Sequence, residues 1–478
     1  MRIADLKIAV AALALSVPLA ARPLELRLLD GIKSYGGSAQ TTFRAVVTVP
    51  YEKDGKVWLP AGSVVSGSVA EAKSVGIGFA RERARIRLEF TEYELPDGRR
   101  FPLVARVRRV DNAREDVDAD GCIKGILAAN NFQSFLGGVW MKPDSIVFPR
   151  VLMGLTGLTG RIWSQFSMGP IGAGALIATR FALVRMPEPE IQLPRGTELI
   201  VTVEHLPADA PSFDLQALSV VERDVSEWLT DQPFTITKPG NRPSKDIINV
   251  AFYGTRADLI AAFEASGWRE AEPRTPGSLS RSYAAYSRQA GYATAPASKL
   301  LYRDEEPDFV FQKTFNTMAK RHHVRLWRAE QNGREVWLGG ATHDIGVVFH
   351  AADMSFSHRI HPRIDYERGK IVNDLAFAGC IEPVGYVDRP AAVRDGGEQS
   401  VVTDGRMAVL KLRQCSGVSS QDGAVDSKPL RSHAARMLRR VLLETRNYGL
   451  RGNPYYWAYR AVRWRPRAQE AKLTGVEE

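Results

Sequence analysis

IINVAFYGTRADLIAAFEASG, residues 247–267, is the stretch that decides the fold of the second half of the chain. Its beginning, Ile247 to Tyr253, is mostly apolar, which is typical of a short buried strand. Thr255 and Asp258 then have the spacing of a capping box, in which each side chain accepts a hydrogen bond from the other residue's backbone N–H. The apolar stripe of the following helix consists of Leu259, Ile260 and Phe263. The stretch therefore predicts a strand that leads directly into a helix.

A second segment further along the chain has a similar layout. Ile371, Val372 and Leu375 occupy the stripe positions of a helix, and Gly379 follows as its end. Strand-like runs lie between and after the two helices: Phe309–Lys313, His322–Arg328, Glu335–Ala341, Val384–Val387 and Met407–Leu412. This succession predicts an α+β sandwich over residues 245–420, for which a ferredoxin-like, duplicated arrangement is one form.

The first half of the chain has the pattern of an all-β domain. Arg85 to Phe90 alternates charged and apolar residues, as a strand with one solvated face does. A type I turn is predicted at each Leu-Pro-x-Gly tetrad, residues 59–62, 95–98 and 193–196. Further strand-like runs are Leu24–Leu29, Phe43–Val49, Val64–Ala70 and Glu198–Glu204. We therefore expect a β-barrel or sandwich over residues 22–207, with an apolar insertion at about 113–185.

Length and composition set the class of protein. The chain has 478 residues, of which 44% are apolar and 25% charged, typical of a soluble globular protein with two or three domains. Three cysteines exclude a disulfide-built scaffold and a zinc site made of cysteines alone. Turn-forming residues predict a linker with one short helix at 208–244. A basic, aromatic tail occupies 421–478.

The N-terminus has the pattern of a secretory signal at residues 1–21. Arg2 and Lys7 stand at the start of an apolar run of 14 residues, which is too short to span a membrane as a helix. We therefore expect export to the periplasm or cell envelope. An oxidising compartment allows disulfides, and Cys380 and Cys415 fall in one domain. Because nothing in their spacing shows proximity, free buried thiols are favoured over a pair, and Cys122 is expected to be free.

Five segments of the second domain, in the same order along the chain, carry a family resemblance. They are DIINVAFYGTRADLIAAFEASGW, DFVFQKTFNTMAKRHHVRLWRA, VWLGGATHDIGV, HRIHPRIDYERGKIVNDLAFAG and VVTDGRMAVLKL. Residues 245–415 thereby resemble the LssY C-terminal domain family. The resemblance implies a bacterial envelope-associated protein. Some members of the family join this domain to a membrane phosphatidic-acid-phosphatase-type or DedA-type domain, but the resemblance implies no established activity.

The first domain resembles, more weakly, the TrbI-like barrel of type IV secretion channels. The carrying segments are LPAGSVVSGSV, LPDGRRFPL and LPRGTELIVTV. In those proteins an insert from the barrel can reach the outer membrane. Here Ile162–Thr179 runs for 18 residues without a charge, but its polar residues make it a marginal span. It is either a membrane contact or a buried or surface-lying hairpin.

Histidines concentrate in one part of the second domain. Six of the eight lie within 40 residues: His322, His323, His343, His350, His358 and His361. Because neighbouring side chains on a strand point to opposite faces, His323 shares a face with Arg325 and His322 does not. His343 and Asp344 end the next strand, where loops form sites. The candidate catalytic residues are therefore His322, His323, Arg325, His343 and Asp344.

Three interpretations of this concentration stay open. In the first, a divalent metal that activates water for hydrolysis is held by ligands from the set His343, His358, His361 and Asp365, or Asp344. In the second, a phosphate or another oxyanion binds to His323, Arg325, His343 and Arg359, with a histidine as general acid or base. In the third, the histidines are structural. The H-E-x-x-H motif of metalloproteases does not occur.

The tail concentrates positive charge. The chain has a net charge of +10, and residues 426–478 alone contain 12 basic and 5 acidic residues. Leu430–Arg446 can form a basic helix whose apolar side consists of Met437, Leu438, Val441 and Leu442. Arginines interleaved with tyrosines and tryptophans follow. The tail suits an anionic membrane or envelope surface, or it packs back on the body; nucleic acid also fits, but export argues against it.

The sequence thus predicts an exported bacterial cell-envelope protein that binds an anionic ligand or surface through a His/Arg cluster. The alternative is a phosphoesterase-like hydrolase, with or without a metal, that acts on phosphorylated lipid or envelope material. Substrate, metal content, protein partners and oligomeric state are not predicted.

Overall fold

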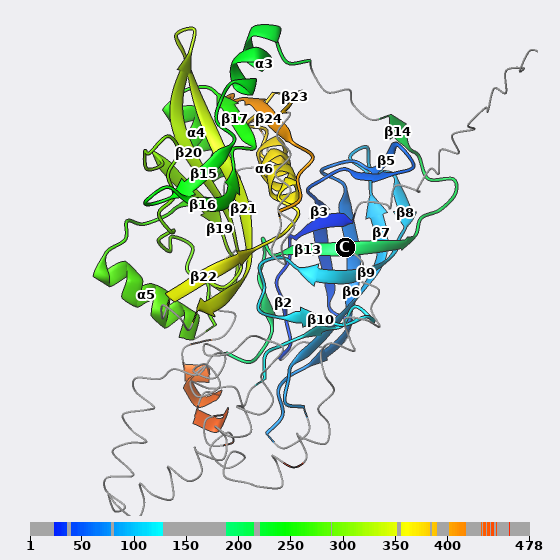
Figure 1. The fold of residues 1–478 in the computed structure, drawn as a ribbon. Coiled ribbons are helices and arrows are strands. Elements are labelled where there is room, and N and C mark those ends of the chain that lie inside the picture. Colours follow the sequence, from blue (N-terminus) through cyan, green and yellow to red (C-terminus); the bar gives the residue numbers. More distant parts are fainter. Residues whose placement is uncertain are drawn as a thin grey trace, which may run out of the picture.

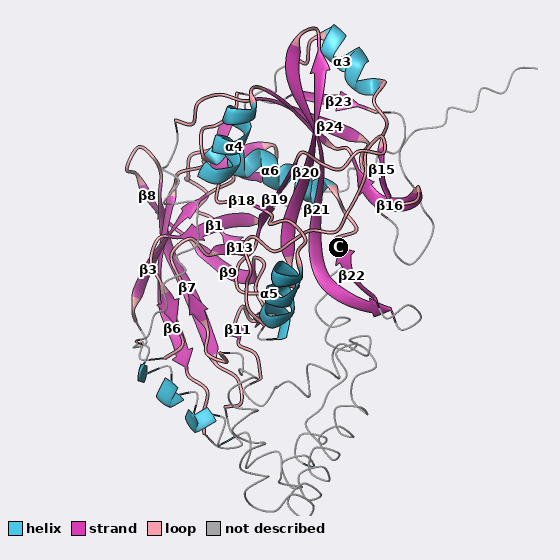
Figure 2. Cartoon of the chain, turned by 90° about the vertical axis from the view of Figure 1, so that its left-hand side faces the viewer, coloured by secondary structure: helices cyan, strands magenta, loops and turns pink. Residues whose placement is uncertain are grey.

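The chain forms two sheet-based domains that lie side by side (Figures 1 and 2). The computed structural model describes residues 23–35, 40–77, 81–127, 188–214, 220–287, 289–350, 355–382, 385–389 and 401–416, with scattered positions between 432 and 458. The expected secretory signal, the apolar run Ile162–Thr179 and most of the tail lie outside the described residues. The expected fold class, a β-domain followed by an α+β domain, is confirmed.

The first domain is a nearly closed, barrel-like antiparallel sheet of nine strands. The strand order is β10-β11-β7-β6-β3-β1-β13-β9, and β8 pairs with β7. These strands are β1 Leu24–Leu28, β3 Thr42–Val47, β6 Val64–Lys73, β7 Arg85–Glu94, β8 Arg100–Pro102, β9 Val104–Val110, β10 Asp116–Val117, β11 Ile123–Lys124 and β13 Glu198–His205. Short strands pair beside the barrel: β2 Ile32–Lys33, β4 Tyr51–Lys53, β5 Lys56–Leu59, β12 Gln192–Leu193 and β14 Phe213–Asp214.

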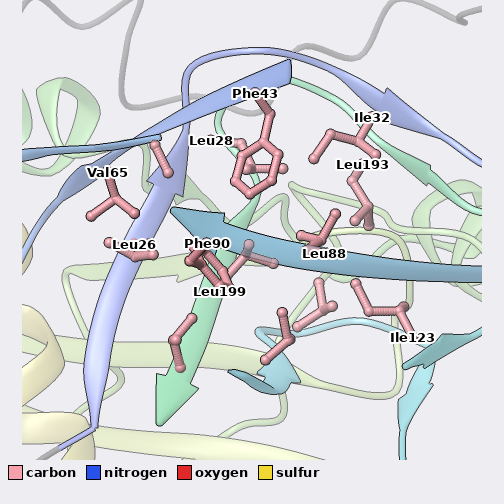
Figure 3. Packing of buried hydrophobic residues seen from close by; sticks show 14 of the residues in the cluster. Leu26, Leu28, Ile32, Phe43, Val65, Leu88, Phe90, Ile123, Leu193 and Leu199 are labelled. Atoms are coloured by element: carbon pink, nitrogen blue, oxygen red, sulfur yellow. The ribbon is translucent and has the colours of Figure 1, made fainter. Parts of the chain in front are cut away.

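Alternation along the strands builds the barrel's core. Ile86, Leu88 and Phe90 of β7 are buried, whereas the charged residues between them are exposed. The Phe90 ring meets Phe43 of β3 edge-on, with ring centroids 5.6 Å apart. Figure 3 shows Phe43, Leu88 and Phe90 packed against apolar residues of the other strands. The period-two pattern of the sequence therefore marks the inner face of the sheet correctly.

The three Leu-Pro-x-Gly tetrads form turns of two kinds. At residues 95–98, Gly98 N donates to Leu95 O at 2.9 Å, as a type I turn beginning at Leu95 requires. At the other two tetrads the turn begins one residue later, because Ser63 N donates to Pro60 O and Thr197 N donates to Pro194 O, both at 3.1 Å. Glycine then occupies the third turn position with a positive φ, which is a type II turn. The type I prediction is therefore right at one tetrad and wrong at two.

The chain returns to the barrel after the insertion, as predicted. β13 pairs with β1 on one side and β9 on the other, so residues after the insertion close the gap between two early strands. The insertion begins later than expected. Residues 113–127 include β10 and β11, and Ile123 of β11 pairs with Ile86 of β7. The predicted start at about 113 is wrong, because these two-residue strands are too short to show any periodicity.

The second domain is built on an eight-stranded sheet of order β18-β19-β20-β21-β17-β24-β23, with β22 paired to β21. Its strands are β17 Val250–Tyr253, β18 Arg269–Glu270, β19 Phe309–Lys313, β20 Arg321–Gln331, β21 Arg334–His350, β22 Ser355–Ile360, β23 Gly385–Asp388 and β24 Arg406–Lys411. β17 and β24 are parallel, and the other pairs are antiparallel.

Both faces of this sheet are covered. Helices α4, Arg256–Ala265, and α6, Asp365–Phe377, contribute to one apolar cluster with the sheet, and the predicted Thr255–Asp258 capping box is present on α4. The opposite face packs against α3, Arg223–Thr230, and the hairpin of β15, Thr235–Lys238, and β16, Arg242–Ile247. The predicted linker at 208–244 is therefore too long, since α3 and most of this hairpin belong to the domain. Helix α5, Pro276–Ser287, is not predicted at all.

The cysteine prediction needs one correction. Cys380, just after α6, forms a disulfide with Cys415, just after β24, so the preference for free thiols is wrong. The end of α6 and the end of β24 meet because both elements contribute to the same apolar cluster. Cys122 is free and buried, as predicted.

The few described tail residues contact the barrel. Leu443 is buried in the barrel's apolar cluster, and Arg439 Nη2 lies 2.6 Å from Glu190 Oε1. The predicted apolar side of this helix is exposed instead, at Met437, Leu438, Val441 and Leu442. None of the helices among the described residues combines the length and apolar character that crossing a membrane requires.

Candidate functional site

Strands β20 and β21 divide the predicted site residues between two faces of the sheet. Their register pairs His322 with His343 and Arg321 with Asp344. Since side chains alternate along a strand, His322 and His343 share the face that carries α6, and His323 lies on the opposite face with Arg325 and Asp344. The five candidate catalytic residues therefore belong to two separate clusters.

The arginine–histidine cluster lies on the face away from α6. Its members are Arg321, His323, Arg325, Asp344 and His358. His323 Nε2 lies 2.7 Å from Asp344 Oδ2, and Arg321 Nη2 lies 3.6 Å from the same oxygen. His358 of β22 completes the group, with Nδ1 3.2 Å from Asp344 Oδ2 and Nε2 3.3 Å from Arg321 Nη2.

Burial sets the protonation states of this cluster. Burial lowers the pKa of His323 to about 4, although Asp344 opposes the shift. Neutral His323 donates its Nε2 proton to Asp344, so its Nδ1 is unprotonated. The pKa of His358 is lowered for the same reason. Burial opposes ionisation of Asp344, but the two histidines and Arg321 outweigh it and lower the pKa of this carboxyl.

Four buried nitrogen atoms of the cluster lack hydrogen-bond partners within the described part of the chain, and one of them is His358 Nδ1, although it lies 3.2 Å from Asp344 Oδ2. The other three are Arg321 Nε, His323 Nδ1 and Arg325 Nε. The guanidinium ends are otherwise engaged: Arg321 Nη1 donates to Gln312 Oε1 at 3.2 Å, and Arg325 Nη2 donates to Ser298 Oγ at 3.1 Å. A buried donor or acceptor without a partner costs about 1–3 kcal/mol, so a bound polar ligand would satisfy these atoms favourably.

The interface cluster lies on the α6 face, where the two domains meet. It consists of Asp111 and Asn112 of the barrel and His322, His343 and Glu367 of the second domain. His322 donates from Nδ1 to Glu367 Oε2 at 2.6 Å and from Nε2 to Asp111 Oδ2 at 2.8 Å. Although burial opposes the charge, these two carboxylates raise the pKa of His322 to about 10. Burial raises the pKa of Glu367 to about 7, against the effect of His322.

His343 is neutral beside this imidazolium. Its ring stacks on His322 with centroids 4.2 Å apart, and its Nε2 donates to Asn112 Oδ1 at 2.9 Å. Burial and the His322 charge hold the pKa of His343 well below its ordinary value. His361 lies next to it, with its backbone N–H bonded to His343 O at 2.8 Å.

An interdomain ion network adjoins the interface cluster. It consists of Arg27 and Glu198 of the barrel and Lys313, Lys370 and Asp374 of the second domain. All five side chains are at most a tenth exposed. Charged groups in a low-dielectric interior need partners, and here each domain supplies the counter-charges of the other.

The structure does not bring the four predicted metal ligands together. His343 and His361 lie side by side, with ring centroids 6.3 Å apart, but His358 belongs to the arginine–histidine cluster. Asp365 stands at the start of α6 and accepts hydrogen bonds from Thr403 Oγ1 and Asp404 N. Arg359 is exposed, and the His350 side chain lies outside the described part. The predicted oxyanion set is also divided, since His343 and His323 face opposite ways.

The fold and the two clusters define a two-domain protein, in which the α+β domain supplies the arginine–histidine cluster and most of the interface cluster. Residues 229–407 of the chain match the model of the family described as LssY C-terminus, which confirms the resemblance of the second domain. No curated protein matches the chain.

Among solved structures, the chain is similar to the structure of ComB10 of the Com type IV secretion system of Helicobacter pylori. It is 11% identical, covers 41% of this chain and 93% of its own, and has a TM-score of 0.19. At that TM-score the similarity carries no argument about the barrel or its function.

Proposed function

We propose that this chain is an exported cell-envelope protein that binds a phosphate-type oxyanion through the arginine–histidine cluster. The observation that carries the proposal is that three of the unpartnered buried nitrogens, Arg321 Nε, His323 Nδ1 and Arg325 Nε, come from a single strand. They belong to alternate residues of one strand, so all three lie on one face. Guanidinium groups are the preferred donors to phosphate oxygens.

The protonation state of the His323 ring determines which kind of anion fits the cluster. The two Nε–H groups need an acceptor oxygen, whereas unprotonated Nδ1 needs a donor. Hydrogen phosphate and the monoanion of a phosphomonoester offer both, because they carry P–O⁻ and P–OH. Sulfate at neutral pH offers acceptors only and would leave Nδ1 unpaired, so it should bind more weakly.

The exposure of the cluster's side chains indicates where a ligand would enter the site. The His358 side chain is 27% exposed, whereas the other side chains of the cluster are almost fully buried. His358 therefore marks the open side of the cluster. Since one edge of the site meets solvent, a phosphorylated headgroup presented by a larger molecule fits as well as a free phosphate.

Export is supported by the Cys380–Cys415 disulfide, because such bonds persist in oxidising compartments. Fractionation of cells that express the tagged full chain, with a non-reducing gel on each fraction, tests this part of the proposal. The oxidised protein should appear in the envelope or periplasmic fraction. A reduced protein with an intact N-terminus in the cytoplasm would contradict export.

We extend the proposal to the basic tail as a contact for an anionic membrane or envelope surface.

The binding proposal is tested by calorimetric titration of the purified full chain with inorganic phosphate and with sulfate. Arg325→Gln removes one unpartnered donor, and Arg328→Gln, an exposed arginine on the same strand, is the matched control. Loss of a hydrogen bond to a charged group costs about 1.5–3 kcal/mol, so Arg325→Gln should weaken phosphate roughly 10- to 100-fold. Vesicles with phosphatidic acid, compared with phosphatidylcholine alone, distinguish a lipid headgroup from free phosphate. If phosphate fails to bind, or binds both variants alike, the proposal is wrong.

A hydrolase is the second candidate, and one observation favours it. Asp344 holds His323 with its Nδ1 unprotonated, which is the arrangement of an oriented general base. In that case the full chain should release phosphate from a chromogenic phosphomonoester, and His323→Gln should abolish the release while Arg328→Gln does not. If phosphate binds but the phosphomonoester is not hydrolysed, the hydrolase candidate is wrong and the binding function remains.

A further inference from the structure

We infer that the interface cluster is a binding site for a divalent transition metal such as Zn²⁺, held jointly by Asp111 of the barrel and by His322 and His343 of the second domain. One ligand atom from each of these three residues lies within 4.8 Å of the others, the one such group among the described residues. Two imidazoles and a carboxylate are a donor set that suits Zn²⁺ and leaves a position for a further ligand.

An unsatisfied oxygen points to a missing ligand here. Asp111 is 6% exposed, and its Oδ1 accepts no hydrogen bond within the described part of the chain. Arg109 Nη2 approaches this oxygen only to 3.7 Å. Buried carboxylate oxygens are normally paired, and a cation beside Asp111 would supply the missing partner.

The residues around the three ligands are placed as supporting groups of a metal site. Glu367 holds His322 through Nδ1, which fixes the orientation of the ring and leaves Nε2 directed at Asp111. Asn112 donates from Nδ2 to Lys313 O at 3.2 Å, so its Oδ1 faces His343. Asn112 Oδ1 thereby orients the His343 ring, as Glu367 orients that of His322. The metal would replace the proton on His322 Nε2, which leaves to solvent.

The site joins the two domains. Asp111 directly follows β9 of the barrel, whereas His322 and His343 come from the central strands of the second sheet. A metal bound there would tie the barrel to the sheet through three coordinate bonds. It lies on the face opposite the arginine–histidine cluster, so this inference goes beyond the proposed binding of an oxyanion.

The test uses the untagged full chain, stripped of metal with a chelator that is then removed. Titration with Zn²⁺, and with Co²⁺ followed by its visible absorbance, should give one tight equivalent and raise the midpoint of thermal unfolding. His343→Gln removes one ligand and should abolish the cobalt absorbance of a tetrahedral site. His205→Ala removes an exposed histidine of β13 and should bind as the wild type does.

A second variant covers the case in which His343→Gln does not fold. Glu367→Gln keeps all three ligands but weakens the support of His322, so it should lower metal affinity roughly 10- to 100-fold. Absence of a stoichiometric metal in the wild type overturns the inference. So does equal affinity in the wild type and both variants. If the phosphate titration is also done on protein stripped of metal in this way, failure of either proposal leaves the other standing.

Discussion

Glu198 forms ion pairs with residues of both domains. Its Oε1 accepts from Arg27 Nη2 at 2.9 Å and from Lys313 Nζ at 2.7 Å, and its Oε2 accepts from Lys370 Nζ at 2.7 Å. One carboxylate thus neutralises cations from both domains. Removing it would leave Asp374 as the carboxylate that these buried cations still contact in the described part of the chain.

We therefore expect Glu198→Gln to lower the free energy of unfolding by about 3–5 kcal/mol, the usual cost of breaking a buried ion pair on one side. Glu204→Gln, on the same strand, removes an exposed partner of Arg106 and should cost at most about 1 kcal/mol. Denaturant unfolding of the full chain measures both. Equal effects of the two substitutions would show that the network does not hold the domains together.

Residue-scale prediction from the sequence succeeds within a strand and fails across the interface. The alternation of β20 places His323 and Arg325 on one face and His322 on the other, as expected. Asp111 and Glu198 were missed, because their partners lie more than a hundred positions away in the sequence. Neither residue stands in a local pattern that differs from an ordinary strand end. The one available signal is that Asp111 and Glu198 are charged residues at the ends of segments that are otherwise typical of strands.

At the scale of elements, strong local signals were read correctly and weak ones were lost. The Thr255 cap, helix α4 and strand β19 match their predicted positions, because capping residues and apolar runs are local properties. The sequence predicts a linker where the β15–β16 hairpin lies, because β16 contains Pro243 and three charged residues. Helix α5 lacks a clear apolar stripe and an acidic first turn. Only tertiary packing identifies these elements.

The capping box of α4 should have a measurable energy. Thr255→Ala removes the hydroxyl that accepts from Asp258 N and should lower the free energy of unfolding by about 1 kcal/mol. Thr255→Ser keeps a hydroxyl and should stay close to wild type. Urea unfolding of the full chain decides, and an alanine variant as stable as the serine variant would show that the cap is not needed.

The disulfide joins the end of α6 to the end of β24. It closes a separation of 35 residues, which corresponds to about 3–4 kcal/mol of stabilisation in the chain-entropy model. A reducing agent should therefore lower the unfolding midpoint of the wild type but leave a Cys380→Ala, Cys415→Ala variant unchanged. Mass spectrometry of a non-reduced digest should recover the linked peptides. Two separately alkylated peptides, one with Cys380 and one with Cys415, in the non-reduced digest would contradict the pairing.

For the whole molecule, the interdomain ion network makes stability depend on pH. Burial opposes ionisation of Glu198, but Lys313, Lys370 and Arg27 hold its pKa well below the ordinary 4.5. The pKa of Asp374 is lowered by the same lysines, against burial. Since both carboxyl pKa values are lower in the folded state, their contribution is present above the unfolded values and lost as the pH falls below about 4.5.

The unfolding midpoint of the wild type should accordingly fall as the pH is lowered from 5 to about 3. In Glu198→Gln this fall should be smaller, because one of the linked carboxyls is gone. Thermal unfolding in matched low-salt buffers measures both curves. Parallel curves for the two proteins would mean that the acid sensitivity arises outside the interdomain ion network.

The two clusters on opposite faces of β20 and β21 have different proposed roles. The interface cluster and the ion network hold the barrel to the second domain, and the arginine–histidine cluster is left to bind a ligand. Binding at that cluster is the central claim, and His323 reports on it directly.

The most direct test is nitrogen NMR of the full chain labelled with ¹⁵N-histidine, titrated with inorganic phosphate. The Nδ1 signal of His323, assigned by its loss in His323→Gln, should begin in the range of an unprotonated imidazole nitrogen. It should shift to saturation as phosphate binds, in the wild type and in Arg328→Gln but not in Arg325→Gln. A His323 signal that stays in place while phosphate is added in excess would contradict the proposed site.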